Sequence, residues 1–156
     1  PLVNDKKRFD EIDREEWETV LEVNVTGPFL ACKAALPRLT DDASIVNLSS
    51  STVHLGVPGF LHYVTSKAAV IGMTRALATE LGDLGVRVNA VTPGLTHSEA
   101  TLQNDDDYLT GAVAGQALPE SIEPEHVADA VAYLAGPDSA RVTGQVLNVD
   151  AGSSYY

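Results

Sequence analysis

The chain has 156 residues, of which 44% are hydrophobic, which is enough for one globular domain with a sizeable core. Ten basic residues against 22 acidic ones give a formal net charge of −12 at pH 7. Such a charge repels phosphate backbones and anionic lipid surfaces. We therefore expect neither nucleic acid nor a membrane as a partner.

The single cysteine, Cys32, lies in the apolar stretch FLACKAAL and is expected to be a buried, unreactive thiol. One cysteine provides neither a disulfide framework nor a cysteine-based metal site, and we predict no metal centre. The longest apolar runs are too short to cross a bilayer, and the first residues are charged rather than signal-like. These features predict a soluble, cytoplasmic protein.

The first long helix is predicted to begin after Asp13, where acidic residues fill the first turn, and to continue to about Leu36. Inside it, Pro28 has no N–H for the carbonyl oxygen of Asn24, so we expect a kink there that frees this oxygen. Taken alone, the kink is equally compatible with a role in packing only. Its apolar stripe consists of Trp17, Val20, Leu21 and Val25.

The next element, residues 44–50 (SIVNLSS), has the aliphatic and β-branched composition of a short buried strand. It ends in Ser49 and Ser50, and a third serine, Ser51, follows. Ligands bind at the carboxyl ends of strands in α/β sheets, so Ser50 is a candidate site residue. Residues 52–59 (TVHLGVPG) are predicted to form a loop.

A second long helix is predicted over residues 60–85, with Gly85 as its stop and a buried stripe of Val70, Met73, Leu77 and Leu81. Residues 86–94 (VRVNAVTPG) form a second strand that Pro93 and Gly94 interrupt. Residues 95–123, which include Asp105, Asp106 and Asp107, are weakly patterned, and loops of this length are usually lids or binding loops.

A further helix is predicted over residues 124–136, with Pro124 at its first position, and a last strand over residues 144–150. The alternation of helices and strands predicts an α/β fold, with a parallel sheet covered by helices on its faces.

Tyr63 and Lys67 are four residues apart in a helical pattern, so both project from one face of the helix. A free phenol titrates near ~10, and a neighbouring ammonium group favours the phenolate. We therefore expect Lys67 to lower the pKa of Tyr63 and make it an acid/base for an alcohol or carbonyl oxygen. Alone, the pair is also compatible with a packed tyrosine beside a solvated lysine, and Ser50 alone with a strand-end cap.

The combination is more specific than its parts. Asn24, LSS ending in Ser50, Tyr63 thirteen residues later, Lys67, VRVNAVTPG and VTGQVLNVDAG follow one another in order. In order and spacing, they resemble the short-chain dehydrogenase/reductase family over almost the whole chain. The resemblance implies a Rossmann-like doubly wound parallel sheet and an NAD or NADP cofactor, which these residues do not distinguish.

Carried over by position, the resemblance makes Tyr63 the general acid/base. Lys67 would lower the pKa of Tyr63 and hold the nicotinamide ribose, and Ser50 would bind the substrate oxygen. Asn24 would use its carbonyl oxygen to hold a water molecule that links Lys67 to solvent. The further residues implied in cofactor binding are Pro93, Gly94, Thr96 and Ser98, the last in place of a more common threonine.

One departure from the family pattern is larger. Family members carry a TGxxxGxG-type loop and an NAG-type motif, and neither occurs in these residues. The pyrophosphate and adenosine part of a cofactor site, which needs N–H groups at a helix N-terminus, is therefore not encoded here. We expect the chain to be the C-terminal, catalytic half of the fold.

The leading hypothesis is an NAD(P)-dependent oxidoreductase that interconverts a secondary alcohol and a ketone, or reduces a 3-oxoacyl-type carbonyl. The alternative is a catalytically inactive fragment or pseudoenzyme that acts only as an assembly partner. The pocket is expected between the segment after Ser50 and the loop 95–123, with His54, Phe60 and Leu95 in its wall. That loop has no cluster of lysines or arginines, which favours a small, uncharged hydroxy or oxo compound over an acyl-carrier substrate.

Assembly is the last expectation. The two long helices are apolar over more of their circumference than one sheet face requires, as FLACKAAL and AVIGMTRALA show. They resemble the pair that forms a four-helix contact in this family. We therefore expect a homodimer or a homotetramer.

Overall fold

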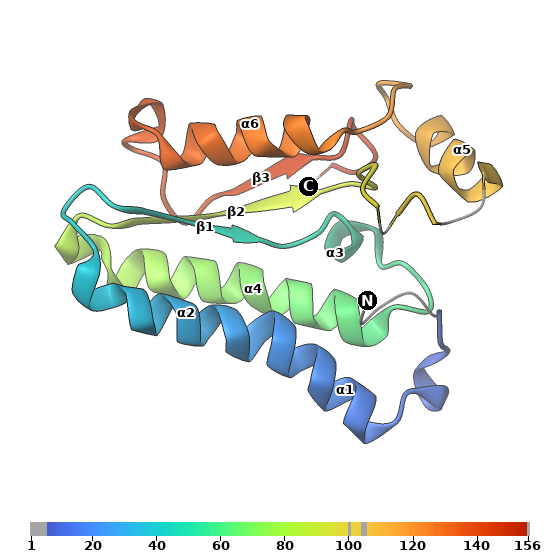
Figure 1. The fold of residues 1–156 in the computed structure, drawn as a ribbon, viewed down its shortest axis with the longest axis horizontal. Coiled ribbons are helices and arrows are strands. Elements are labelled where there is room, and N and C mark those ends of the chain that lie inside the picture. Colours follow the sequence, from blue (N-terminus) through green and yellow to red (C-terminus); the bar gives the residue numbers. More distant parts are fainter. Residues whose placement is uncertain (1–5, 100, 104–105, 156) are drawn as a thin grey trace.

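The structure, a computed structural model, describes residues 6–99, 101–103 and 106–155. Three layers are visible in Figure 1, with a sheet between helices on both of its faces. One face is covered by α6 (Pro124–Ala135), and the other by α4 (Leu61–Glu80), with α1 (Arg14–Leu21) and α2 (Gly27–Ala35) on the same side as α4. The α/β architecture expected from the sequence is confirmed.

The sheet consists of β1 (Ser44–Leu48), β2 (Arg87–Pro93) and β3 (Val146–Val149), in the order β1-β2-β3. Both pairings are parallel, with Ile45 opposite Val88 and Val91 opposite Leu147. All three strands lie where the β-branched runs of the sequence predict them. Because the strands are parallel, their carboxyl ends meet at one edge of the sheet.

The first helical run is continuous but irregular near Asn24. Its start is as predicted, since the Asp13 side chain accepts a hydrogen bond from the N–H of Glu16 at 2.9 Å. After α1, residues Glu22–Thr26 form a π-helical turn, in which the N–H of Gly27 donates to the carbonyl oxygen five residues back. Pro28 then lies in the first turn of α2. The expected irregularity is present, as a π turn before the proline rather than as a break.

Two segments predicted as loops contain helices. Residues 52–59 include α3 (Thr52–Leu55), which ends at Gly56 with φ of +59°. Residues 95–123 include α5 (Asp106–Ala114). The helix α5 was missed because glycine lowers helix propensity and because its apolar face lines a cavity rather than the core. Asp105 lies outside the described residues.

Burial along α4 differs from the predicted stripe. Val70 and Leu81 are buried as expected, whereas Met73 and Leu77 are only partly buried. The helix packs against β1 and β2 on one side and against α1 and the π turn on another, so polar residues are buried too. Its other buried residues are His62, Ser66, Ile71, Thr74 and Ala78. Helix α4 ends at Glu80, and Gly85, with φ of +72°, ends the short turn that follows.

A core cluster of Ala78, Leu81, Val86 and Val88 holds α4 against β2. Cys32 was expected to be buried but is only partly buried. The structure describes all of α2, and no residue of this helix is buried. Burial still raises the pKa of the Cys32 thiol. Within the described ranges, no helix is long and apolar enough to cross a membrane.

Candidate active site

The carboxyl edge of the sheet brings Ser50 beside the end of β2. The N–H of Ser49 donates to the carbonyl oxygen of Val91 at 2.8 Å, and the N–H of Ser51 donates to that of Pro93 at 3.0 Å. These bonds extend the β1–β2 pairing beyond the strands and hold Ser50 between them. Ser50 is 8% exposed.

A cavity of about 550 Å³ opens at this edge. Five of the residues predicted from the sequence line it: Ser50, Tyr63, Gly94, Thr96 and Ser98. Asn24, Lys67 and Pro93 do not line it. Lys67 lies near the ring of Tyr63 and Pro93 accepts a hydrogen bond from Ser51, whereas Asn24 is connected to Tyr63 through Ser66. The volume is within the ~300–1,000 Å³ of small-molecule sites.

Tyr63 is partly buried in the first turn of α4, with its side chain in the cavity wall. Burial raises the pKa of the Tyr63 phenol above its ordinary value, and a hydrogen bond with the Ser50 side chain partly opposes this. We expected Lys67 to lower this pKa, whereas the net shift of the pKa in the structure is upward. The reason is that the loss of solvent around the phenol outweighs the favourable contacts of the phenolate.

Lys67 is one turn beyond Tyr63. Its Nζ lies 5.7 Å from the centroid of the Tyr63 ring and donates a 3.0 Å hydrogen bond to the carbonyl oxygen of Leu48. Burial lowers the pKa of Lys67. The ammonium group therefore lies against the ring and the end of β1.

The Ser50 hydroxyl accepts two hydrogen bonds, from the hydroxyl of Thr52 at 3.0 Å and from the N–H of Thr52 at 3.3 Å. Because Thr52 supplies both donors, the hydrogen of Ser50 is left to donate elsewhere. The contact that lowers the pKa of Tyr63 matches such a donation to the phenol oxygen. Ser50 can therefore donate a hydrogen bond to an oxygen atom in the cavity.

Asn24 reaches this site through its side chain. Its Nδ2 donates to the hydroxyl of Ser66 at 3.0 Å, and that hydroxyl donates to the carbonyl oxygen of Tyr63 at 2.7 Å. Ser66 is fully buried. The π turn is thus tied to the segment of α4 that carries Tyr63 and Lys67.

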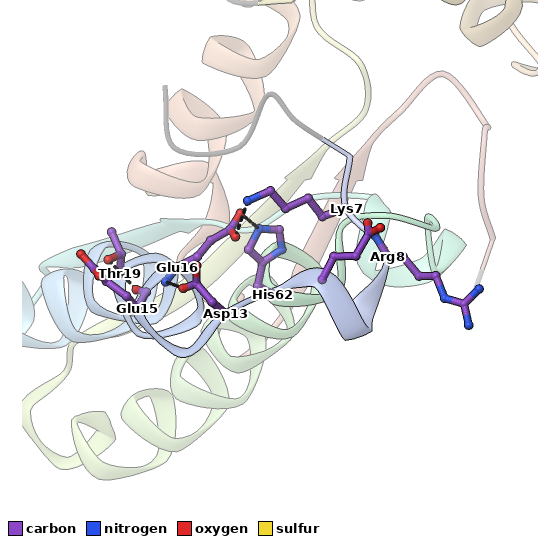
Figure 2. A network of polar contacts seen from close by, with 8 residues as sticks. Lys7, Arg8, Asp13, Glu15, Glu16, Thr19 and His62 are labelled. Atoms are coloured by element: carbon purple, nitrogen blue, oxygen red, sulfur yellow. Dashed lines mark hydrogen bonds and ion pairs between the residues drawn. The ribbon is translucent and has the colours of Figure 1, made fainter.

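A second polar network holds the start of α4. Figure 2 shows Lys7 and His62 converging on the carboxylate of Glu16, which is in α1. The Nζ of Lys7 is 2.7 Å from Oε2 of Glu16, and Nε2 of His62 is 3.4 Å from Oε1. His62 is 1% exposed and directly precedes Tyr63. The network therefore connects α1, the segment before it and the turn that carries the phenol.

Gly94 connects the cavity to the end of β3. Its N–H donates to the carbonyl oxygen of Val149 at 2.9 Å, and a Cβ added to it would lie 2.9 Å from the Cα of Asp150. Thr96 donates through its hydroxyl to the carbonyl oxygen of Gly94 at 3.2 Å. The Ser98 hydroxyl is 3.2 Å from that of Thr101, so the segment after β2 is held by its own side chains.

The sequence predicted that residues 95–123 bound the cavity, but not which of them line it or that they include a helix. Phe60 and Leu95 line the cavity as expected, whereas His54 is not among the lining residues. The lining that was not predicted is one face of α5 with the residues that follow it: Tyr108, Gly111, Ala112, Gly115 and Gln116. Their spacing of three, one, three and one residues is that of a single helical face, which was the available signal.

The chain is similar to known proteins in sequence and in fold. A family model described as "Enoyl-(Acyl carrier protein) reductase" matches residues 2–154. The chain is 38% identical over 140 residues to a 3-oxoacyl-[acyl-carrier-protein] reductase FabG of Thermotoga maritima, covering 88% of this chain and 57% of that protein. It is 37% identical over 147 residues to 3beta-hydroxysteroid dehydrogenase 1 of Eggerthella lenta, covering 91% of this chain and 56% of that protein.

Solved structures give the same result. A short-chain dehydrogenase/reductase from Brucella melitensis superposes with a TM-score of 0.93 at 32% identity, over 99% of this chain and 62% of that one. A blue fluorescent protein from a metagenomic library, in complex with NADPH, has a TM-score of 0.89 at 34% identity, over 96% of this chain and 60% of that one. The chain therefore spans little more than half the length of the curated relatives it matches. From its sequence and its fold, the chain belongs to the short-chain dehydrogenase/reductase family.

Proposed function

We propose that this chain is the catalytic part of an NAD(P)-dependent oxidoreductase that interconverts a secondary alcohol and a ketone, or reduces a 3-oxoacyl-type carbonyl. The observation that supports it best is that Ser50 and Tyr63 line the wall of one cavity, with Lys67 beside the Tyr63 ring. A proton donor and a second hydrogen-bond donor can then meet one substrate oxygen. This is what acid/base chemistry at a carbonyl requires.

The residues present fit the nicotinamide end of NAD or NADP. Tyr63 and Lys67 would hold the ribose, while Gly94, Thr96 and Ser98 would hold the nicotinamide, with Pro93 supporting them from the end of β2. These residues provide hydroxyl and backbone groups around one cavity, with the Lys67 ammonium group beside the Tyr63 ring, which suits a polar ring with an amide. The 156 residues contain no TGxxxGxG-type loop, so we assign only this end of the dinucleotide to them. When bound, the cofactor supplies or takes up the hydride.

The chain's own residues manage the proton and the charge. In carbonyl reduction, the phenol of Tyr63 donates its proton to the substrate oxygen as the carbonyl carbon becomes tetrahedral. In alcohol oxidation, the phenolate removes that proton. Ser50 donates a hydrogen bond to the same oxygen and stabilises the negative charge that develops on it. Lys67 stabilises the phenolate that each reduction leaves behind.

We place Asn24 in a supporting role. Its amide connects the π turn to Ser66 and so to the backbone of Tyr63. In addition, the carbonyl oxygen of Asn24 would hold a water molecule through which Lys67 exchanges protons with solvent. The proton lost by Tyr63 would then be replaced without opening the cavity.

A second candidate is an inactive chain that acts only as an assembly partner. The observation behind it is the exposed apolar surface of α2, where Phe29 is 48% exposed and Leu30 is 51% exposed. Such a surface suits an assembly role whether or not the chain is active. We assign this surface to a homodimer or homotetramer of the active enzyme, because such apolar patches are typical of interfaces. Sedimentation of the wild-type protein and of Leu30→Glu should show an oligomer that the substitution weakens.

The decisive test is Tyr63→Phe in the protein as it is encoded, with any residues that flank these 156. The substitution keeps the ring and removes the proton donor, so turnover should fall by at least ~100-fold. Binding of NADH or NADPH, followed by nucleotide fluorescence, should persist and show that the fold is intact. An unchanged rate would contradict the acid/base assignment, and a wild-type protein that binds neither nucleotide would favour the assembly partner.

A further inference from the structure

The wall formed by α5 affects which substrates the cavity accepts, a role that rests on the proposed function. In Figure 1, α5 lies beyond the carboxyl ends of the strands, apart from the layers that cover the sheet. Tyr108, Gly111 and Ala112 of α5 line the cavity, followed by Gly115 and Gln116. This face of α5 therefore meets whatever occupies the cavity.

The centre of this face has almost no side chain. A Cβ added to Gly111 would have no described atom within 4 Å, and one added to Gly115 would meet only backbone oxygens of its own helix, at 3.6 Å or more. Glycine in a helix costs stability relative to alanine, and neither position needs glycine for a positive φ. The glycines widen the cavity without any need that the fold itself imposes. Space beside Gly111 is thus available to a ligand.

The same region of the wall has no formal charge. If Gly94, Thr96 and Ser98 contact the cofactor, the remaining surface includes Leu55, Val57, Phe60 and Tyr108 along with the small residues of α5. No Lys, Arg, Asp, Glu or His is among the described residues that line the cavity. Such a surface desolvates a neutral apolar group at little cost and a charged group at a high one.

The polar groups near this wall are already engaged. The amide nitrogen of Gln116, oriented to satisfy its neighbours, donates to the carbonyl oxygens of Glu120 at 2.8 Å and Leu118 at 3.1 Å. The Nζ of Lys6 lies 4.8 Å from the centroid of the Tyr108 ring and 6.0 Å from that of the Phe60 ring. Both rings line the cavity, whereas Lys6 does not.

Acidic groups add to the discrimination. Asp106 and Asp107 form the exposed first turn of α5, next to Tyr108, and the chain as a whole carries a net charge of −12. The two carboxylates and the net negative charge repel an anion that approaches the cavity, while a neutral molecule is unaffected. Lys6 lies near the Tyr108 and Phe60 rings of this wall, and the neighbouring carboxylates oppose its positive charge.

We propose that Gly111 is a specificity-determining residue that opens the cavity to an uncharged ketone or secondary alcohol with a ring-sized apolar body. Gly111 leaves the width for the ring, and the uncharged apolar wall contacts it. The reacting oxygen faces Ser50 and Tyr63. A larger residue at position 111 would fill this space while leaving the reacting end of the cavity as it is.

The test measures binding, so it does not depend on turnover. Three probes are titrated calorimetrically into the protein as it is encoded, with oxidised NAD or NADP present, whichever the protein binds, so that no ketone is reduced. They are cyclobutanone, the bicyclic ketone β-tetralone, and a β-tetralone with a carboxylate on its aromatic ring. The variants are Gly111→Leu and a matched control on the same helix, Ala114→Leu, whose position is exposed and does not line the cavity.

The wild-type protein should bind β-tetralone more tightly than the other two probes. In Gly111→Leu, the ratio of the β-tetralone affinity to the cyclobutanone affinity should fall at least about tenfold, since even one methylene is worth that much in a filled pocket. Ala114→Leu should leave the ratio unchanged. Circular dichroism shows whether each variant is folded, and Gly111→Ala, which adds a single methyl, serves if the leucine variant is not.

Other outcomes overturn the inference. One is an unchanged ratio of β-tetralone to cyclobutanone affinity in Gly111→Leu, and another is failure of the wild type to bind β-tetralone. A third is tighter binding of the carboxylate probe than of β-tetralone, with this preference lost in Lys6→Met. In each case, turnover of any other carbonyl compound that depends on Tyr63 would leave the proposed function standing. Conversely, the expected binding pattern without any turnover would support the specificity assignment and contradict the proposed function.

Discussion

The side-chain amide of Asn24 donates a 3.0 Å hydrogen bond to the hydroxyl of Ser66, the residue directly before Lys67. Asn24 is in the π turn and Ser66 in α4, so the bond joins two segments 42 residues apart. Ser66 is fully buried, and its hydroxyl donates a hydrogen bond to the carbonyl oxygen of Tyr63. The irregular turn in the first helix is thereby connected to the backbone of the candidate acid/base.

Asn24→Ala should lower both stability and turnover, because it leaves the buried hydroxyl of Ser66 without its donor. A typical cost of such a loss is about 1–3 kcal/mol in the free energy of unfolding, measurable by urea denaturation. Ser66→Ala removes the hydroxyl itself, and with it both the bond from Asn24 and the bond to the carbonyl oxygen of Tyr63, and serves as the matched variant. If Asn24→Ala had the stability and the kcat of the wild type, the amide would have no positioning role.

The pH dependence of the two reaction directions should differ. Burial raises the pKa of Tyr63, so the phenol stays protonated at least up to its ordinary pKa of ~10. Carbonyl reduction needs the phenol and should be level through neutral pH, falling only above about pH 10. Alcohol oxidation needs the phenolate and should still be rising there. Steady-state rates from pH 6 to 11, in both directions, check this.

Ser50→Ala provides a control for that profile, because the Ser50 hydrogen bond is the contact that lowers the pKa of Tyr63. Its removal should move the rise in alcohol oxidation to higher pH, besides lowering the rate. A profile that moved to lower pH in Ser50→Ala would contradict the hydrogen-bond assignment.

Gly94→Ala should destabilise the fold as well as the site. The added Cβ would lie 2.9 Å from both the Cα of Asp150 and the Cδ1 of Ile122, which is closer than carbon atoms pack. Overpacking of this kind costs about 1–3 kcal/mol, observable as a lower midpoint of urea unfolding. Gly72→Ala, at an exposed helical position with no described atom within 4 Å of the added Cβ, is the control and should be neutral or stabilising.

Asp150 should make stability depend on acid pH. Burial acts to raise its pKa, but hydrogen bonds outweigh this and hold the pKa below its ordinary value, the side chain accepting from the Ser154 hydroxyl at 2.7 Å and the N–H of Gly152 at 3.0 Å. Because the folded pKa is the lower one, the stabilisation is present above the unfolded value of ~3.9 and is lost as pH falls through the folded pKa.

Asp150→Asn should remove that part of the acid dependence and cost about 1.5–3 kcal/mol at neutral pH, since hydrogen bonds to a charged group are lost. Urea unfolding at pH 7 and at pH 3 measures both quantities. If the wild type and Asp150→Asn lost the same free energy between these two pH values, Asp150 would not be the responsible carboxylate.

Much of the site could be predicted because its spacing is local. Tyr63 and Lys67 are one turn apart on one helix, and Ser50 follows a strand whose β-branched composition is clear in the sequence. Parallel strands then bring the residues after β1 and β2 to the same edge, whatever the details of packing. Gly94, Thr96 and Ser98 were found in the cavity wall for this reason.

Other features could not be read from the sequence, because they depend on contacts between distant segments. The wall provided by α5 faces a cavity instead of the core, so its helix lacked a strong apolar pattern. The bond between Asn24 and Ser66 needs the π turn and α4 to be packed together.

The sequence by itself determined the order of helices and strands and the candidate acid/base residues, since periodicity and chain order are local properties. Only the tertiary structure decided the state of those residues. The pKa of Tyr63 is the clearest case: its sequence neighbour Lys67 predicts a lower value, whereas burial by the whole site raises it. Desolvation is set by every segment packed around a group, and no local spacing records it.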